Sequence, residues 1–157
     1  MKILLTAFSG KTNSSKLLID SIDTDCKLFL TNSFLSSGKQ IIDTIKTIRP
    51  DFILAFGQKP KSNCIYIETQ AHRENILQTN FDVAQLSESL SKNNISSELS
   101  DNAGNYLCNY VYYEGLKYIT QDRLDTKMVF IHVPSMKEFI NFGEMKFWLA
   151  EYMEGAQ

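Results

Sequence analysis

The sequence contains no long hydrophobic run, no concentrated basic stripe and no cluster of cysteine and histidine residues. Its longest apolar stretches have the length of a strand and are too short to cross a membrane. The 16 lysine and arginine residues are scattered among 18 acidic residues, so the charge pattern typical of a nucleic-acid interface is missing. No cysteine and histidine spacing matches a zinc site. The sequence therefore predicts no membrane, nucleic-acid, metal or cofactor partner.

Cysteine is scarce, and we interpret the first segment as a strand and not as a secretory signal. The apolar part of the first segment, MKILLTAF, is about five residues long, below the roughly 7–15 that a signal needs. The three cysteines, Cys26, Cys64 and Cys108, form an odd number, which favours reduced thiols when no signal is present. We therefore expect a cytoplasmic protein.

Strand-like and helix-like segments alternate along the chain. Apolar or alternating patterns predict strands at 2–8, 26–30, 51–57, 63–71, 95–100 and 128–133. Helical spacing and capping residues predict helices from Asn13, from Ser36 or Ser37 to Pro50, from Asp82 to about Leu90, from about Gly104 to Ile119, and from Ser135 to Met153. This order favours an α/β fold of three layers, α/β/α, with an open, mostly parallel sheet of the phosphorylase/hydrolase-like kind. The 157 residues are enough for one domain, residues 1–157.

One motif resembles a nucleotide site without meeting its requirements. SGKT, at 9–12, lies between a strand and a helix, as a phosphate-binding loop would. That loop requires a glycine five positions before Gly10, where this chain has Leu5, so we do not expect a nucleotide. His72 has no partner nearby in sequence, and we interpret it as a solvated surface histidine.

Cysteine, histidine and glutamate are predicted to meet at one edge of the sheet. The carboxyl ends of parallel strands and the amino ends of the following helices share that edge. Cys108 lies near the start of a predicted helix, where the helix dipole favours a thiolate and a depressed pKa. His132 lies at the end of a strand, and Glu68 lies among apolar residues, where an unpaired carboxylate is costly.

These three residue types together indicate a thiol hydrolase. A cysteine nucleophile needs an imidazole to take its proton and an acid to orient that imidazole. Taken singly, each residue has a simpler interpretation. Cys108 could pack in the core, His132 could be a structural histidine, and Glu68 could face solvent. Their convergence on one predicted edge strengthens the catalytic hypothesis and leaves the simpler interpretations open.

The segments around Cys108 and His132 resemble the two signature segments of pyroglutamyl peptidase I, also called pyrrolidone carboxyl peptidase. NAGNYLCNYVYY is similar to the family's Ala-Gly-x-aromatic-aliphatic-Cys-Asn segment, and FIHVP to its aromatic-Ile-His-aliphatic-Pro segment. The step of 24 residues from Cys108 to His132 is also similar to the family's. PDFILAFGQ, with Glu68 ten positions after Gln58, resembles the segment that leads to the family's acid. The resemblance extends over the whole chain, with gaps.

The resemblance implies a cytosolic cysteine peptidase that removes an N-terminal pyroglutamyl group from peptides. It implies Cys108 as the nucleophile, His132 as the general base and Glu68 as the orienting acid. It also implies a set of substrate-binding residues. These are Phe8, Tyr106 and Leu107 along the apolar pocket, Gln58 in a segment whose backbone contacts the lactam, and Asn13 as a reader of the pyroglutamyl carbonyls.

Three departures from the family pattern change what we expect of the pocket and the assembly. The family's Pro-Phe-Gly-Gly stretch is missing after Phe8, KPKSN replaces Gly-Gly-Arg, and the segment between Glu68 and Asp82 is much shorter. We therefore expect a shallower, more open pocket and a homo-oligomer, if one forms, that is smaller or differently built. Two alternatives stay open: an amidase for another small acyl or lactam group, and a non-catalytic ligand-binding relative.

Overall fold

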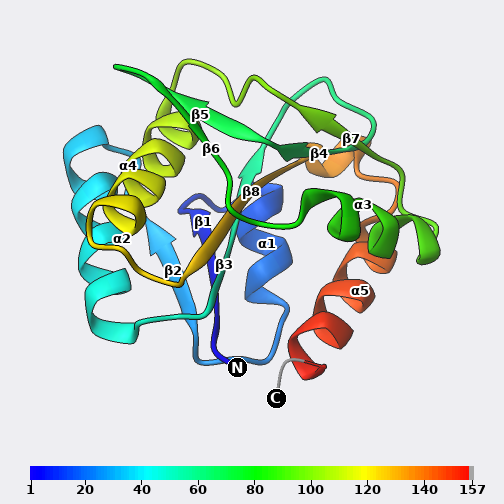
Figure 1. The fold of residues 1–157 in the computed structure, drawn as a ribbon. Helices are drawn as coiled ribbons and strands as arrows, with labels where there is room; N and C mark the ends of the chain where they lie inside the picture. The colour runs from blue at the N-terminus through cyan, green and yellow to red at the C-terminus, as the bar shows by residue number, and fades with distance from the viewer. Residues whose placement is uncertain (156–157) are drawn as a thin grey trace.

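The computed structural model describes residues 1–155, in which strands and helices alternate as expected (Figure 1). The elements in chain order are β1 (Ile3–Phe8), α1 (Ser14–Asp20), β2 (Lys27–Leu30), α2 (Phe34–Ile48), β3 (Phe52–Gln58), β4 (Ile65–Glu68), β5 (Gln70–His72), β6 (Ile76–Gln78), α3 (Val83–Lys92), β7 (Ser97–Ser100), α4 (Leu107–Gln121), β8 (Lys127–Val133), the 3₁₀ turn Met136–Glu138, and α5 (Phe142–Glu154). Among these residues, no helix is both long and apolar enough to cross a membrane.

Six strands form one sheet in the order β2-β1-β3-β8-β4-β7. The first four run parallel, and β4 pairs with β8 in the antiparallel direction. Every residue of β1 is buried, and so are the central residues of β3 and β8. Strands that are apolar on both faces are typical of parallel sheets covered by helices on both sides. The predicted mostly parallel sheet is confirmed.

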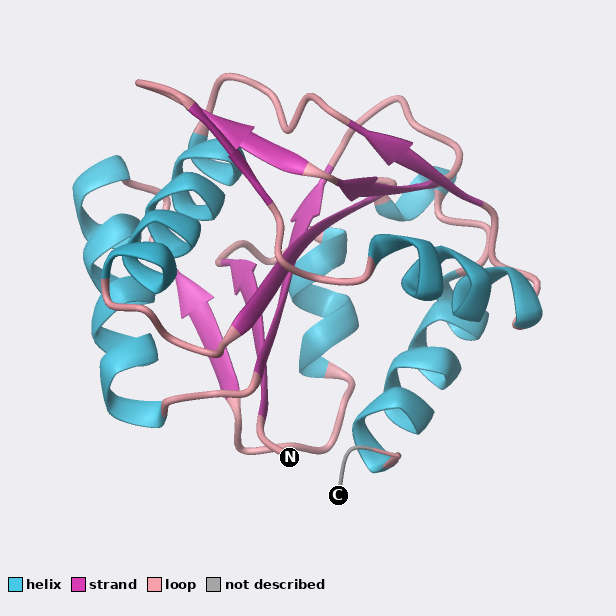
Figure 2. Ribbon diagram, in the orientation of Figure 1, coloured by secondary structure: helices cyan, strands magenta, loops and turns pink. Residues whose placement is uncertain are grey.

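Helices cover both faces of this sheet, and the predicted three-layer architecture is also confirmed (Figure 2). Side chains of α2 and α4 pack in one core, which includes Leu4, Ile53 and Phe130 of the sheet. Side chains of α1, α3 and α5 pack in a second core on the opposite face, with Leu5 and Leu54. Because neighbouring residues of a strand point to opposite faces, each position along a strand can be assigned to one core or the other.

Several predicted element boundaries are wrong for local reasons. Helix α2 begins at Phe34, because the side chain of Ser33, rather than Ser36 or Ser37, caps it. Helix α4 begins at Leu107, three residues later than predicted. Gly104 has a φ of 89°, a left-handed conformation that a helix cannot contain.

The regions 63–71 and 135–153 are each divided into two elements. The first contains β4 and β5, and β5 leaves the main sheet to pair with β6, a strand that the sequence did not predict. The second contains the 3₁₀ turn and, after a break, α5. The short β5–β6 hairpin occupies the chain between Glu68 and Asp82, where the family resemblance implied a longer loop.

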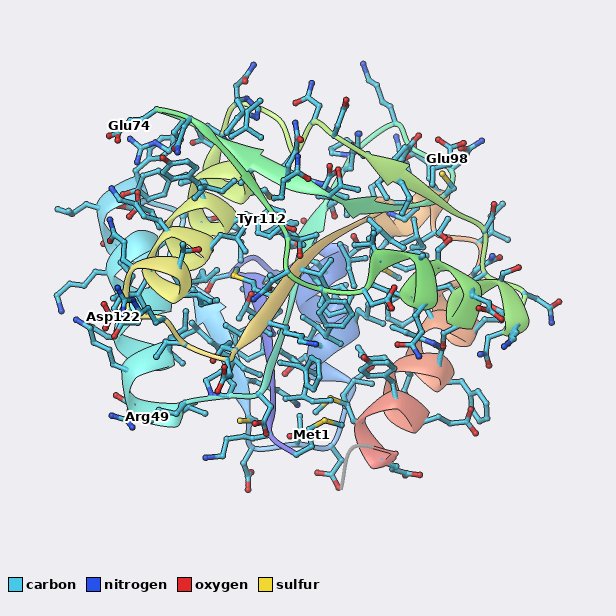
Figure 3. All side chains as sticks on the ribbon, in the orientation of Figure 1. Met1, Arg49, Glu74, Glu98, Tyr112 and Asp122 are labelled. Carbon is cyan, nitrogen blue, oxygen red and sulfur yellow. The ribbon has the colours of Figure 1, made fainter. Side chains whose placement is uncertain are left out.

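The β5–β6 hairpin is fastened to α4, the helix that carries Cys108. The amide of Asn109 bonds both backbone groups of His72: its Oδ1 accepts from the His72 N–H at 3.0 Å and its Nδ2 donates to the carbonyl at 2.6 Å. Arg73 forms an ion pair of 2.7 Å with Glu114 of α4. Tyr112, labelled in Figure 3, points inward from α4 and donates a 2.8 Å hydrogen bond to the Glu68 carbonyl. These contacts fix the start of α4 against the sheet.

Candidate active site

The candidate site lies where β3, β8 and β4 meet the start of α4. In the register of the sheet, His132 is paired with Gly57 of β3 on one side and with Tyr66 of β4 on the other. Cross-strand partners place their side chains on the same face, here the face that α4 covers. Glu68 lies two residues beyond Tyr66 and therefore shares this face as well. Three strands thus present the predicted residues to one helix.

Glu68 and His132 form the hydrogen bond that the sequence analysis predicted. Glu68 Oε1 lies 2.8 Å from His132 Nδ1, and the pair is buried, with side-chain exposures of 0% and 7%. The other carboxylate oxygen, Oε2, has no hydrogen-bond partner among the described residues. A buried carboxylate is costly without a partner, so the bond to the imidazole fixes the positions of both side chains. The other ring nitrogen of His132, Nε2, takes no part in this bond.

Cys108 is the second residue of α4 and lies directly over Gly57. A β-carbon placed on Gly57 would lie 2.7 Å from Cys108 Sγ and 2.8 Å from a ring carbon of Phe130. Because Gly57 is the register partner of His132, the thiol lies over the strand next to the imidazole. A glycine inside an otherwise apolar strand is a known sign of close approach. The sequence analysis missed this role of Gly57, although that signal was present.

The expected depression of the Cys108 pKa is wrong. Burial, with a smaller contribution from the negative charge of Glu68, raises the pKa of the Cys108 thiol to about 12. A hydrogen bond from the backbone N–H of Cys108 acts in the opposite direction but does not outweigh the loss of solvation. At neutral pH the resting thiol is therefore protonated, and any thiolate must form by transfer of its proton to a base.

All three cysteines are half-buried, and Cys26 and Cys64 lie one residue before β2 and β4, not within strands as predicted. Burial is also the main cause that raises the pKa of Cys26 and of Cys64. All three thiols are free. A lowered pKa therefore does not distinguish Cys108 from the others, and its distinguishing feature is its position next to His132.

We expect alkylation of Cys108 in the resting protein to be slow at pH 7 and to accelerate steadily as the pH rises above 9. The reason is that the reactive thiolate becomes the main form only near the raised pKa. Alkylation with iodoacetamide at several pH values, followed by peptide mapping, measures the rate for each cysteine. A plateau of the Cys108 rate below pH 7 would instead indicate a preformed thiolate–imidazolium pair.

Replacing Gly57 with alanine is expected to lower turnover about 100-fold, since a displacement of about 1 Å in a reacting group can cost that much. The new methyl group would overlap the thiol and the Phe130 ring, and both would have to move. Gly143→Ala is the matched control, because a β-carbon there meets nothing within 4 Å. Steady-state kinetics and thermal unfolding of both variants separate a displaced thiol from a general loss of stability.

The residues predicted to bind substrate lie around the same edge of the sheet. Phe8 ends β1 and is buried, as is Leu107, while Tyr106 is 68% exposed and packs edge-on against Phe34. The two polar residues lie by the start of α1. Gln58 Oε1 accepts a 2.9 Å hydrogen bond from the Ser14 N–H, and the Asn13 side chain caps α1.

The exposed Tyr106 borders an open hollow of about 480 Å³. It is lined by Phe34, Leu35, His72, Arg73, Asn105, Tyr106, Asn109 and Tyr110. His72 lies on this rim and is only half exposed. Its Nε2 lies 3.2 Å from Asn105 Oδ1 in an exposed hydrogen bond, so the histidine lies at the surface, as expected, and is bonded to the loop before α4. Within residues 1–155, no group of three or more histidine, cysteine or acidic side chains could hold a metal ion.

The candidate site thus places the half-buried Cys108 next to the buried pair of His132 and Glu68, on an open α/β/α sheet. Known structures share this fold. A mutant pyrrolidone carboxyl peptidase from the hyperthermophile Pyrococcus furiosus superposes with a TM-score of 0.84 over 98% of this chain and 97% of its own, at 20% identity. Pyroglutamyl peptidase I from Bacillus amyloliquefaciens gives 0.83 over 94% and 90%, also at 20% identity.

Sequence comparison identifies the family. The family model described as pyroglutamyl peptidase matches residues 75–145. Pyrrolidone-carboxylate peptidase 2 of Caldanaerobacter subterraneus subsp. tengcongensis is 30% identical, over 85% of this chain and 81% of its own length. Pyrrolidone-carboxylate peptidase 1 of the same organism is 29% identical, over 88% and 84%. The chain belongs to the pyroglutamyl peptidase family of cysteine peptidases, as its sequence motifs indicated.

Proposed function

We propose that this protein is a cysteine peptidase that removes an N-terminal pyroglutamyl group from short peptides, with Cys108, His132 and Glu68 as its catalytic residues. The observation that carries the proposal is the buried 2.8 Å bond between Glu68 and His132 beside the Cys108 thiol. Family membership supplies the substrate class, and the pyrrolidone-carboxylate peptidases named above are its sequence relatives. The free thiols are consistent with a reducing, cytosolic setting.

The proposed reaction begins with proton transfer from Cys108 to His132. With Nδ1 donating to Glu68, Nε2 accepts the thiol proton as sulfur attacks the acyl carbon of the pyroglutamyl group. The Glu68 carboxylate stabilises the imidazolium that results. His132 then returns the proton to the leaving amine, and a thioester remains on Cys108. A water molecule, deprotonated by the same imidazole, hydrolyses the thioester and restores the thiol.

The start of α4 offers N–H groups to the oxyanion that forms at each attack. The N-cap residue, Tyr106, makes no side-chain capping bond, so the first N–H groups of α4 are not engaged by a cap. Such groups, together with the positive end of the helix dipole, stabilise negative charge on the acyl oxygen. Phe8 and Leu107 supply apolar walls for the lactam ring, and the Asn13 side chain and the Gln58 backbone supply polar groups at the ends of β1 and β3.

Cleavage of a fluorogenic pyroglutamyl amide tests the proposal. We expect release of the fluorophore, and we expect no release from the matching prolyl amide, which lacks the lactam carbonyl. Peptide mapping after treatment with a thiol-reactive probe is the accompanying measurement. Labelling of Cys108 without turnover would replace the proposal with an amidase for a different acyl group. Neither labelling nor turnover would favour a non-catalytic binding protein.

A further inference from the structure

The candidate site has an order across the sheet that assigns a side to each half of the substrate. Phe8 lies on β1, the Cys108 thiol lies over Gly57 on β3, His132 lies on β8, and Tyr66 lies on β4. In the proposed reaction His132 protonates the leaving amine, so that amine must lie on the β8 side of the thiol. The residue that follows the scissile bond then extends toward β4 and Tyr66, away from Phe8 on β1.

Lys59 lies beside Tyr66, on the side of the site where the leaving residue is expected. Lys59 directly follows β3, and its N–H bonds the Val133 carbonyl at 2.8 Å, so the strand pairing continues through it. Gln58 bonds to α1 on the other face, so Lys59 points to the face of His132. The Lys59 ammonium lies 4.0 Å from the centre of the Tyr66 ring, within cation–π distance. The side chain therefore extends from the end of β3 to Tyr66 on β4, the register partner of His132.

The charge of this lysine is not neutralised by an ion pair. No carboxylate lies within ion-pair distance of Lys59 among the described residues. The loops after β1, β3 and β8 together contain four lysines and a single acid, Glu138. That carboxylate already accepts hydrogen bonds from the Ser135 hydroxyl and the Lys61 N–H. These loops thus carry net positive charge, which is opposed on this face by Glu98 of β7, the register partner of Tyr66.

We propose that Lys59 and Tyr66 form the binding site for the residue after the scissile bond, and that Lys59 binds its free carboxylate. This inference rests on the proposed function and narrows its substrate class to short pyroglutamyl peptides, above all dipeptides, whose C-terminal carboxylate lies one residue from the cleaved bond. The Tyr66 ring holds the ammonium in place and packs against the leaving residue. Lys59 acts as a specificity-determining residue and takes no part in the bond changes.

The test compares pyroglutamyl-alanine with its C-terminal amide, which differs only in the carboxylate. We expect the wild-type kcat/KM to favour the acid by about three- to fivefold, as for a partly exposed ion pair, and added salt to reduce this preference. In Lys59→Gln the preference should disappear while turnover of the amide is retained. Lys46→Gln is the matched control, because Lys46 lies over a tyrosine ring, Tyr118, on α2 and α4 instead.

Removal of a nearby negative charge, that of Glu98, provides a second test with the opposite expected effect. Glu98 is the register partner of Tyr66 on the edge strand β7, and it is exposed on the same face. Because its negative charge repels a substrate carboxylate, Glu98→Gln should increase the preference for the acid. Equal rates for acid and amide in the wild type, or a preference that survives Lys59→Gln, would overturn the inference and leave the proposed peptidase function intact.

Binding to the Cys108→Ser variant separates this inference from the proposed function. Calorimetry with the two dipeptides measures recognition without turnover. If neither is cleaved by the wild type but the acid binds more tightly and requires Lys59, the carboxylate site stands and the peptidase function fails. If the two dipeptides bind equally, or neither binds, the inference fails regardless of catalysis.

Discussion

Cys108→Ser is expected to abolish cleavage of pyroglutamyl amides while leaving the fold unchanged. Serine is nearly isosteric, and it fits over Gly57, where the thiol lies now. Its hydroxyl is a far weaker acid than the thiol, and the burial that raises the thiol pKa to about 12 also disfavours an alkoxide. Transfer of a proton from this serine to His132 is therefore far less favourable than transfer from the thiol. Steady-state kinetics with the fluorogenic amide, beside circular dichroism and thermal unfolding, measure the two effects separately.

The other cysteines provide the controls for this experiment. Cys26→Ser and Cys64→Ser make the same chemical change at half-buried positions away from His132 and Glu68, and a serine at position 64 can keep the hydrogen bond that Cys64 forms with Tyr66. Both should keep turnover within about twofold of the wild type, since substitutions away from special features usually change energies by less than 0.5 kcal/mol. Activity that survives in Cys108→Ser, or that is lost in one of the controls, would show that the nucleophile has been assigned to the wrong residue.

The residues of the candidate site could be predicted from the sequence because their constraints are local. Cys108 follows a helix-start pattern, and His132 ends an apolar strand. Parallel strands followed by helices bring such positions to one edge of the sheet. Glu68 was recognised because an acid among buried apolar neighbours needs a partner, and the structure supplies His132 as that partner.

Other features depend on contacts between distant segments and were therefore missed. Strand β6 is short and has no periodic pattern of its own, and it exists because β5 pairs with it over α4. The close contact of Gly57 with the thiol requires knowing which part of α4 lies above β3. The pKa of Cys108 was wrongly predicted for the same reason. The helix start is visible in the sequence, whereas the protein packed around the thiol and the distance to the Glu68 charge are not.

Glu68→Gln is expected to lower turnover by roughly 10²–10⁴, the range assigned to general acid–base assistance. A glutamine can still accept the hydrogen bond from His132 Nδ1 at the position of Oε1, so the imidazole keeps its place. It loses the negative charge that stabilises the imidazolium after the thiol proton has been transferred. The substitution does not affect the hydrogen bond from the Tyr112 hydroxyl to the backbone carbonyl of Glu68, so the fold should be retained.

Glu114→Gln is the matched control for this substitution. Glu114 is a largely buried acid on α4, with a side-chain exposure of 16%, and it also pairs with one basic group, Arg73. Removal of its charge weakens the attachment of the β5–β6 hairpin but leaves the hydrogen bond of His132 intact. We expect a modest loss of thermal stability and a change in turnover of less than about tenfold, small beside the catalytic loss expected for Glu68→Gln.

Glu68→Gln should increase the rate at which Cys108 is alkylated, although it lowers turnover. Because the Glu68 charge contributes to the raised pKa of Cys108, its removal lowers that pKa and increases the thiolate fraction at any pH below it. Alkylation of Cys108 in Glu68→Gln should therefore be faster than in the wild type at pH 9, although cleavage is slower. A structural collapse of the site would expose the thiol and abolish cleavage, but it would also lower the melting temperature. Three results together would identify Glu68 as the group that stabilises the proton on His132. They are faster alkylation, slower cleavage and an unchanged melting temperature. Turnover that stays at the wild-type level would reduce the catalytic residues to a cysteine–histidine dyad.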